Sequence, residues 1–252
     1  MQFLLCQMEL SKVAPTDAVM TLLWDFKLEM KFIKDLTRLY QDNSNKENAE
    51  GMTAYFRNKF EFFGIKAGPR RNLLKIALDE NKEEITEHYL DIVKSLYSLP
   101  EREFHMCAME IYERQKRKKY EVQDIQDIEF LIAMNSWWDS VDYIAKNILG
   151  AYLLMYPDQL KPTLSGFSIS ENMWLQRSTI IFQLGYKTKT KEDILFQQCM
   201  KFKDSNEFFL QKAIGWALRE YAKTNPQSVL NFVNSALLKP LSHKEAIRNI
   251  VK

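Results

Sequence analysis

Two residues with matched chemistry, Trp138 and Asp142, stand four positions apart in the segment SWWDSVD (136–142). Side chains at this spacing lie on one face of an α-helix. An indole ring can hold a cationic ring, and a carboxylate beside it can stabilise positive charge that develops during a reaction. Asp139 falls in the first turn of the same expected helix, where a negative charge suits the helix dipole. The less specific alternative is a surface carboxylate at Asp142 that pairs with Lys146 one turn later.

A second stripe combines one aromatic ring with three cations on the expected helix 206–223. Lys212, Trp216, Arg219 and Lys223 occupy positions i, i+4, i+7 and i+11 and therefore line one face. An indole can stack on a nucleic-acid base while cations hold phosphates. The alternative is a partly buried tryptophan packed against the aliphatic stems of the basic side chains.

The expected helix 171–185 repeats the combination in weaker form. Trp174 and Arg177 are three residues apart, and Ile180 and Leu184 provide an apolar side. We expect Trp174 to belong to the core and Arg177 to be the polar member that faces outward.

The charge of the chain is unevenly distributed. The net charge is only +2, from 35 Lys and Arg and 33 Asp and Glu. Residues 172–252 contain 13 basic and 6 acidic residues, a net charge of +7, and residues 1–171 carry the remaining −5. A basic half suggests a polyanionic partner such as nucleic acid.

Several classes of site are absent from the sequence. The chain has neither a GxGxxG nor a GxxxxGK[ST] loop, so the common nucleotide-binding loops are missing. Its three cysteines and three histidines are scattered, which excludes a disulfide framework and zinc-ligand spacing and predicts no metal site. A reducing, cytoplasmic location is the default expectation. No apolar run approaches the 18 residues of a membrane span, so no membrane association is expected.

The elements that must position these residues are predicted to be helices throughout, because apolar residues recur at spacings of three and four. Helices of 12–18 residues in consecutive pairs predict an all-α, curved solenoid of HEAT-like antiparallel helix pairs with a concave basic face. An ordinary multi-helix bundle is the alternative. Residues 1–29 fit this pattern poorly and are expected to be an N-terminal extension, so residues 30–252 form the predicted domain. The expected helices are about 30–42, 46–61, 69–80, 82–98, 101–118, 121–134, 137–155, 171–185, 190–203, 206–223, 226–238 and 242–251.

Over residues 30–252 the sequence resembles the AlkD-type DNA alkylation repair glycosylases, a family built of HEAT-like repeats. The resemblance is carried, in order, by TAYFRNKFEFFGIK (53–66), PRRNLLK (69–75), LPEREF (99–104), SWWDSVD (136–142), NMWLQRSTIIFQLGYK (172–187) and EFFLQKAIGWALREYAKTNP (207–226).

The resemblance implies a monofunctional enzyme that hydrolyses the N-glycosidic bond of N3- or N7-alkylated purines in double-stranded DNA. It implies no cofactor, no metal and, we expect, a monomer. The family's functional positions correspond to Trp138, Asp142, Arg177 and Trp216. A family tyrosine corresponds to Tyr55, and family positions that face the DNA backbone correspond to Arg71, Lys212, Arg219 and Lys223.

The chemistry of the residues agrees with this implication. An N3- or N7-alkylated purine is already cationic, so it can leave without a general acid, and one carboxylate can stabilise the sugar cation and place a water. A carboxylate beside such a substrate is expected to have a pKa at or below the ordinary value of about 3.9. Two other functions stay open: a non-catalytic HEAT-like module that binds nucleic acid, and a protein–protein scaffold.

Overall fold

The computed structural model describes residues 30–250, and these form helices joined by short turns, with one isolated β-bridge between Glu61 and Glu101. The all-α prediction is confirmed. The expected extension, residues 1–29, lies outside the described residues. The helices are α2 (Lys31–Asp42), α3 (Lys46–Tyr55), α4 (Ala67–Glu80), α5 (Lys82–Ser98), α6 (Arg102–Lys116), η1 (Val122–Asp124), α7 (Ile125–Ala133), α8 (Trp138–Tyr143), η2 (Ile144–Leu149), α9 (Gly150–Met155), η3 (Pro157–Gln159), α10 (Leu160–Ile169), α11 (Met173–Ile181), η4 (Lys187–Lys189), α12 (Glu192–Phe202), α13 (Phe208–Ala222), α14 (Pro226–Ala236) and α15 (Pro240–Ile247).

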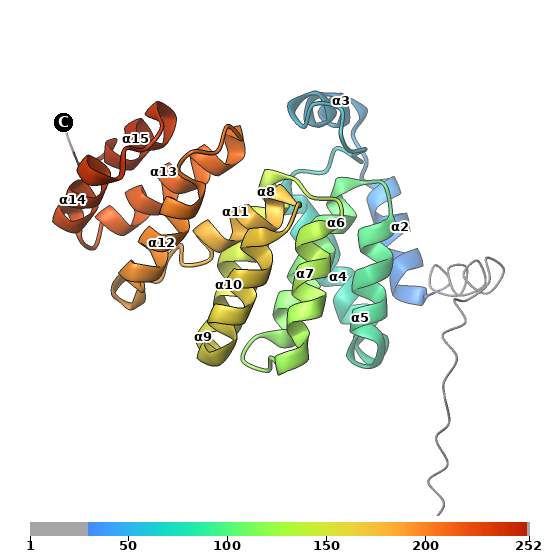
Figure 1. Cartoon of the computed structure of the whole chain (residues 1–252). Coiled ribbons are helices and arrows are strands. Elements are labelled where there is room, and N and C mark those ends of the chain that lie inside the picture. The colour runs from blue at the N-terminus through green and yellow to red at the C-terminus, as the bar shows by residue number, and fades with distance from the viewer. Residues whose placement is uncertain (1–29, 251–252) are drawn as a thin grey trace, which may run out of the picture.

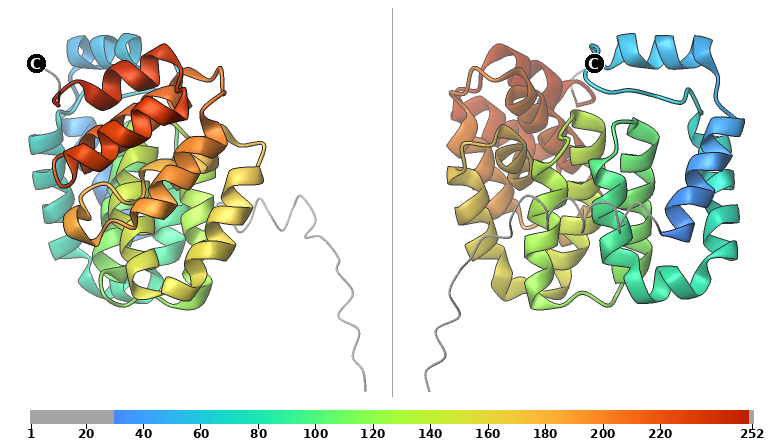
Figure 2. Two further views of the ribbon diagram at one scale, coloured as in Figure 1. Left: turned by 60° about the vertical axis from the view of Figure 1, so that its left-hand side comes forward. Right: turned by 90° about the vertical axis from the view of Figure 1, so that its right-hand side faces the viewer.

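The helices follow one another in space as they do in sequence. Figure 1 shows a row of neighbouring helices that runs from α2 and α5 through α7 and α10 to α12 and α14. This is the order of a solenoid, in which each helix pair packs mainly against the pairs before and after it. Both views of Figure 2 show the same layering, with the C-terminal helices at the end of the row opposite α2.

Periodic apolar residues explain why these segments are helical. In α2 the fully or almost fully buried residues are Phe32, Ile33, Leu36 and Tyr40, which recur at three- and four-residue spacings on one face. The buried side chains form two clusters, one centred on α2 to α10 and the other on α11 to α15. Helix α11 supplies residues to both, so the two cores meet there. Among residues 30–250, no helix is long and apolar enough to cross a membrane.

Helix α3 lies apart from this packing. It has no buried residue, and Figures 1 and 2 show it above the row, on the same side as α15. The expected helix 46–61 is too long, because α3 ends at Tyr55. After the C-cap residue Phe56, Arg57 and Asn58 adopt left-handed backbone with φ of 57°. Non-glycine residues seldom continue a helix from this conformation.

One helix, α10, is absent from the sequence-based prediction. Its segment LKPTLSGFSI contains Pro162 and Gly166 together with a threonine and two serines, all of which lower helix propensity. Pro162 is nevertheless compatible with the helix, because it occupies the first turn, where no backbone N–H bond is lost. Leu160, Leu164 and Phe167 bury the apolar face, so packing outweighs the weak propensity.

Candidate active site

A cavity of about 510 Å³ collects most of the residues singled out from the sequence. The expected site residues Trp138, Asp142, Arg177 and Trp216 all line it. Its walls come from the α3–α4 segment and from α8, α11, α13 and α15, which span nearly the whole described chain. The lining residues are Tyr55, Arg57, Trp137, Trp138, Asp142, Arg177, Phe208, Phe209, Lys212, Trp216, Arg219 and Glu245.

Asp142 lies in the cavity wall in a two-point ion pair with Arg177. Arg177 Nε donates to Asp142 Oδ1 at 2.7 Å, and Arg177 Nη2 donates to Asp142 Oδ2 at 2.9 Å. The guanidinium also donates to the carbonyl oxygen of Phe209 in α13. The expectation that Arg177 faces outward is wrong, because its side chain is only 4% exposed and its charge is satisfied inside. Asp142 therefore pairs with a residue 35 positions away and not with the neighbouring Lys146 proposed as the alternative.

The surroundings of Asp142 act on its pKa in opposite directions. Burial raises the pKa of Asp142, Arg177 lowers it by hydrogen bonding and charge, and the net change is upward. The expected pKa at or below the ordinary value is therefore wrong for the free protein. The sequence argument considered the cation of the substrate and neglected the removal of the carboxylate from water.

Several aromatic rings pack together at the cavity wall that contains Asp142. The half-buried Trp138 is stacked with Phe56 at 6.1 Å between ring centroids and meets Tyr55 edge-on at 6.2 Å. Tyr55 itself is 68% exposed at the rim. The predicted tyrosine and tryptophan are therefore neighbours, although 83 residues separate them. Trp137 and Phe209, which line the cavity, pack with Trp174 and connect α8, α11 and α13.

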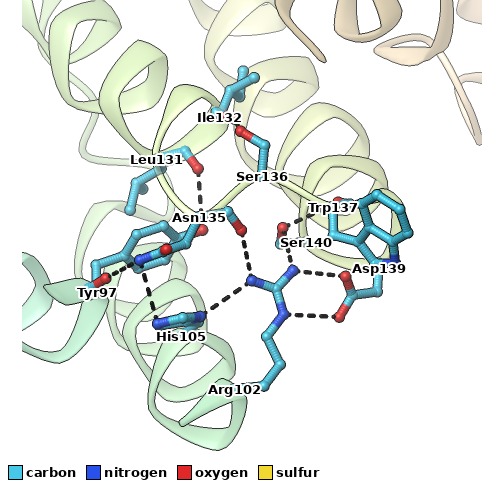
Figure 3. A network of polar contacts seen from close by, with 10 residues as sticks. All are labelled: Tyr97, Arg102, His105, Leu131, Ile132, Asn135, Ser136, Trp137, Asp139 and Ser140. Carbon is cyan, nitrogen blue, oxygen red and sulfur yellow. Dashed lines mark hydrogen bonds and ion pairs between the residues drawn. The ribbon is translucent and has the colours of Figure 1, made fainter. Parts of the chain in front are cut away.

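A buried arginine, Arg102, holds the start of α8, the helix that carries Trp138 and Asp142 (Figure 3). Its guanidinium donates to both oxygens of Asp139, at 3.2 and 2.6 Å, and to Ser140 Oγ at 2.7 Å. It also donates to the carbonyl of Asn135 at 2.7 Å, in the turn before the helix. Asp139 lies in the first turn of α8, as expected, and also forms an ion pair with the buried Arg102.

His105 completes this network as a neutral ring. Its Nδ1 lies 3.1 Å from Arg102 Nη1, which can only donate, so Nδ1 must accept. Its Nε2 lies 2.7 Å from the carbonyl of Leu99, so the proton resides on Nε2. Burial and the neighbouring Arg102 lower the pKa of His105 to about 4. At neutral pH the uncharged ring therefore accepts from Arg102 through Nδ1 and donates to Leu99 through Nε2.

Glu103, the residue that follows Arg102, fixes the loop formed by residues 63–65. Its buried carboxylate accepts the backbone N–H groups of Phe63, Gly64 and Ile65 at 3.2, 2.9 and 3.0 Å. Gly64 has φ of +83°, and a Cβ there would stand 2.1 Å from the carbonyl oxygen of Asn45. The two adjacent charged residues of the LPEREF segment therefore fix α8 on one side and the loop behind Tyr55 on the other.

On α13 two of the predicted DNA-contacting cations already have a partner. Lys212 Nζ lies 2.9 Å from Glu245 Oε1, and Arg219 Nη1 pairs with Glu245 Oε2. Trp216, between them along the helix, is half-buried against the C-terminal core. The apolar face of the helix is buried, with Ala213, Ile214, Ala217 and Leu218 at most 5% exposed.

Two predicted DNA-contacting residues lie outside this cavity. Arg71 is 62% exposed on α4 and lies 3.1 Å from Glu110, which it shares with Arg70. Lys223 is 61% exposed just beyond α13 and lies 2.5 Å from Glu220. Both side chains are therefore exposed to solvent despite their acidic partners.

Sequence reasoning missed five lining residues: Arg57, Trp137, Phe208, Phe209 and Glu245. Phe208 stands next to Phe209 but does not belong to the buried face of α13, since it is 53% exposed. An apolar residue outside the buried face of a helix could have indicated Phe208 as a site residue. Glu245 had none, because its place in the cavity depends on how α15 packs against α13.

Comparisons with known proteins agree on one family. A family model for "DNA alkylation repair enzyme" matches residues 36–250. A solved structure described as "Predicted DNA alkylation repair enzyme from Enterococcus faecalis" is 32% identical, with a TM-score of 0.76. That match covers 83% of this chain and 97% of the other. A search of curated proteins gives no match.

Proposed function

The chain belongs to the family of DNA alkylation repair enzymes, and on that premise we propose that it is a monofunctional DNA glycosylase. The substrate is an N3- or N7-alkylated purine in duplex DNA, and the reaction is hydrolysis of its N-glycosidic bond. The observation that carries the proposal is the position of Asp142, a carboxylate held by Arg177 in a cavity wall that also contains Trp138 and Trp216.

Each of these residues has a task in the reaction. Alkylation at N3 or N7 makes the purine cationic, and the faces of Trp138 and Trp216 can hold such a ring. As the glycosidic bond breaks, the sugar gains positive charge, which the Asp142 carboxylate stabilises. The same oxygen atoms can orient the attacking water. Arg177 is a positioning residue, because its two-point contact fixes the plane of the carboxylate.

The electrostatics of the cavity suit a polyanion that carries a local cation. The cavity is lined by four cations and two carboxylates: Arg57, Arg177, Lys212, Arg219, Asp142 and Glu245. The excess positive charge suits phosphates, and the carboxylates suit the alkylated base. Tyr55, Arg71, Lys212, Arg219 and Lys223 are proposed to contact the DNA. We also expect a monomer that works in the cytoplasm.

The test is release of 7-methylguanine or 3-methyladenine from alkylated duplex DNA by the purified protein. Wild type should release the base, and Asp142→Asn, which keeps nearly the same shape, should be slower by about 10²–10³-fold in a single turnover. Asp158→Asn, an exposed acid in η3, is the control and should match wild type.

Two results would contradict the proposal. Binding of alkylated DNA without release of the base would favour the alternative, a non-catalytic nucleic-acid-binding module. Release by Asp142→Asn within a few-fold of wild type would remove the assigned role of the carboxylate while leaving the activity in place.

A further inference from the structure

A second carboxylate, Glu245, lines the same cavity as Asp142. It projects from α15 between Lys212 and Arg219 of α13, one turn on either side of Trp216. Its side chain is 15% exposed, compared with 37% for Lys212 and 22% for Arg219. The carboxylate therefore lies deeper than the lysine with which it pairs.

The placement of Glu245 is built into the packing of two helices. Gly215 of α13 has no side chain, and a Cβ there would stand 2.4 Å from Glu245 Cβ and 3.0 Å from the carbonyl of Ser242. The absent side chain lets α15 approach closely enough for Glu245 to reach both cations. Ser242 Oγ adds a hydrogen bond of 3.0 Å to the carbonyl of Gln211.

This arrangement has a consequence for any anion that enters. A DNA phosphate that approaches Lys212 and Arg219 meets a site whose net charge is +1, since Glu245 cancels one of the two positive charges. Lys212 and Arg219 hold the pKa of Glu245 below its ordinary value, so the carboxylate is ionised at neutral pH and cannot serve as a proton donor. A cationic purine in the cavity experiences the opposite effect, because the same carboxylate attracts it.

We propose that Glu245 is a specificity-determining residue: it competes with DNA phosphates for Lys212 and Arg219 and so disfavours undamaged DNA relative to DNA that carries a cationic base. The proposal rests on the function proposed above. It adds a role for α15 that the reaction itself does not require, namely rejection of the undamaged DNA that surrounds each lesion.

The experiment compares the affinity of wild type and Glu245→Gln for two duplexes of one sequence. One is undamaged, and the other carries a single 2′-fluoro-7-methylguanosine, whose fluorine slows cleavage of the bond. For undamaged DNA the variant should bind about fivefold more tightly at low salt. Its slope of log K against log salt should steepen by about 0.9, the value of one additional phosphate contact. The preference for the alkylated duplex should fall.

Asp193→Asn, which removes an exposed acid from α12, is the matched control for the change in net charge and should shift the affinity much less. A double-mutant cycle that combines Glu245→Gln with Lys212→Gln gives a second test, in which the affinity for undamaged DNA is compared among all four proteins. Loss of Lys212 should cost more undamaged-DNA affinity in the Glu245→Gln background than in wild type.

The outcomes separate this inference from the proposed function. If wild type binds duplex DNA and Glu245→Gln gains no affinity, or gains equally for both duplexes, the specificity role is overturned and the glycosylase proposal stands. Equal costs of Lys212→Gln in the two backgrounds overturn it as well. If neither protein binds duplex DNA, the proposed function fails and the specificity role fails with it.

Discussion

At the scale of single residues, the site depends on partners that lie far away in sequence. Trp138 and Asp142 share a helix face because they are four residues apart, and that much was predictable from local periodicity. The partner of Asp142 was not predictable in the same way. Arg177 is 35 residues away, and only the packing of α8 against α11 brings the two charges within 2.7 Å. Arg177 therefore looked like a surface residue in the sequence and proved to be buried.

The pairing of Asp142 with Arg177 predicts the pH dependence of base release. In the proposed reaction Asp142 must be ionised to stabilise the sugar cation, so activity should be lost as the pH falls through its pKa. Because burial raises this pKa, the acid limb should lie above the ordinary value of about 3.9. Arg177→Gln removes a cation that lowers the pKa of Asp142, so the acid limb should move to higher pH.

The measurement is kcat/KM for 7-methylguanine release against pH, which reports the groups of the free protein, at a temperature where circular dichroism shows each protein folded. Arg38→Gln, on the exposed side of α2, is the control and should keep the wild-type profile. An acid limb that does not move in Arg177→Gln would mean that a group other than Asp142 limits the rate at low pH.

At the scale of elements, two neighbouring charged residues fix two of the segments that form the site. Arg102 fixes the start of α8, and Glu103 fixes the loop that follows α3. The sequence marked LPEREF only as part of a family resemblance. Its physical role could not be predicted, because it depends on contacts with residues about 40 positions before and after it.

Removal of Arg102 should leave a buried, unpaired charge at Asp139. We expect Arg102→Met to lower the free energy of unfolding by about 3–5 kcal/mol, since Arg102 is 1% and Asp139 11% exposed. Asp139→Asn should also be costly. Because both changes break the same ion pair, the double variant should lose less than the sum of the two, by about 0.5–3 kcal/mol. Urea unfolding measures all three, and strictly additive losses would show that the pair is not coupled.

The contact between α13 and α15 makes a second prediction at this scale. Glycine inside a helix is usually less favourable than alanine by about 0.8–1.0 kcal/mol. Gly215→Ala should nevertheless destabilise the protein by about 1–3 kcal/mol, because its Cβ would collide with Glu245 and force α15 away. Gly166→Ala in α10 is the control, since nothing lies within 4 Å of a Cβ there. Thermal unfolding should move in opposite directions for the two variants, and a shift of both in the same direction would contradict the close packing.

At the scale of the whole molecule, the uneven charge of the sequence acquires a geometric meaning. Asp142 comes from the acidic part of the chain, residues 1–171, whereas Arg177, Lys212 and Arg219 come from the basic remainder. The solenoid brings both parts around one cavity, from Tyr55 near one end to Glu245 near the other. The helical class and the basic half were predictable because they depend on local periodicity and composition. The position of α3 and α15 at the same cavity was not predictable, because it depends on the sum of small rotations between successive helix pairs.

The proposed function and the charges of the cavity together predict the class of base that the protein releases. Glu245 is kept ionised by two cations, Asp142 is paired with Arg177, and no histidine lines the cavity in the described part of the chain. The cavity thus offers negative charge for a sugar cation but no placed acid for a leaving base. We expect release of 7-methylguanine and 3-methyladenine, whose glycosidic bonds are weakened by positive charge. Uracil and 1,N6-ethenoadenine should persist in the same duplex over the same time. Chromatography of released bases measures this, and excision of either neutral base would require a proton donor and a different mechanism.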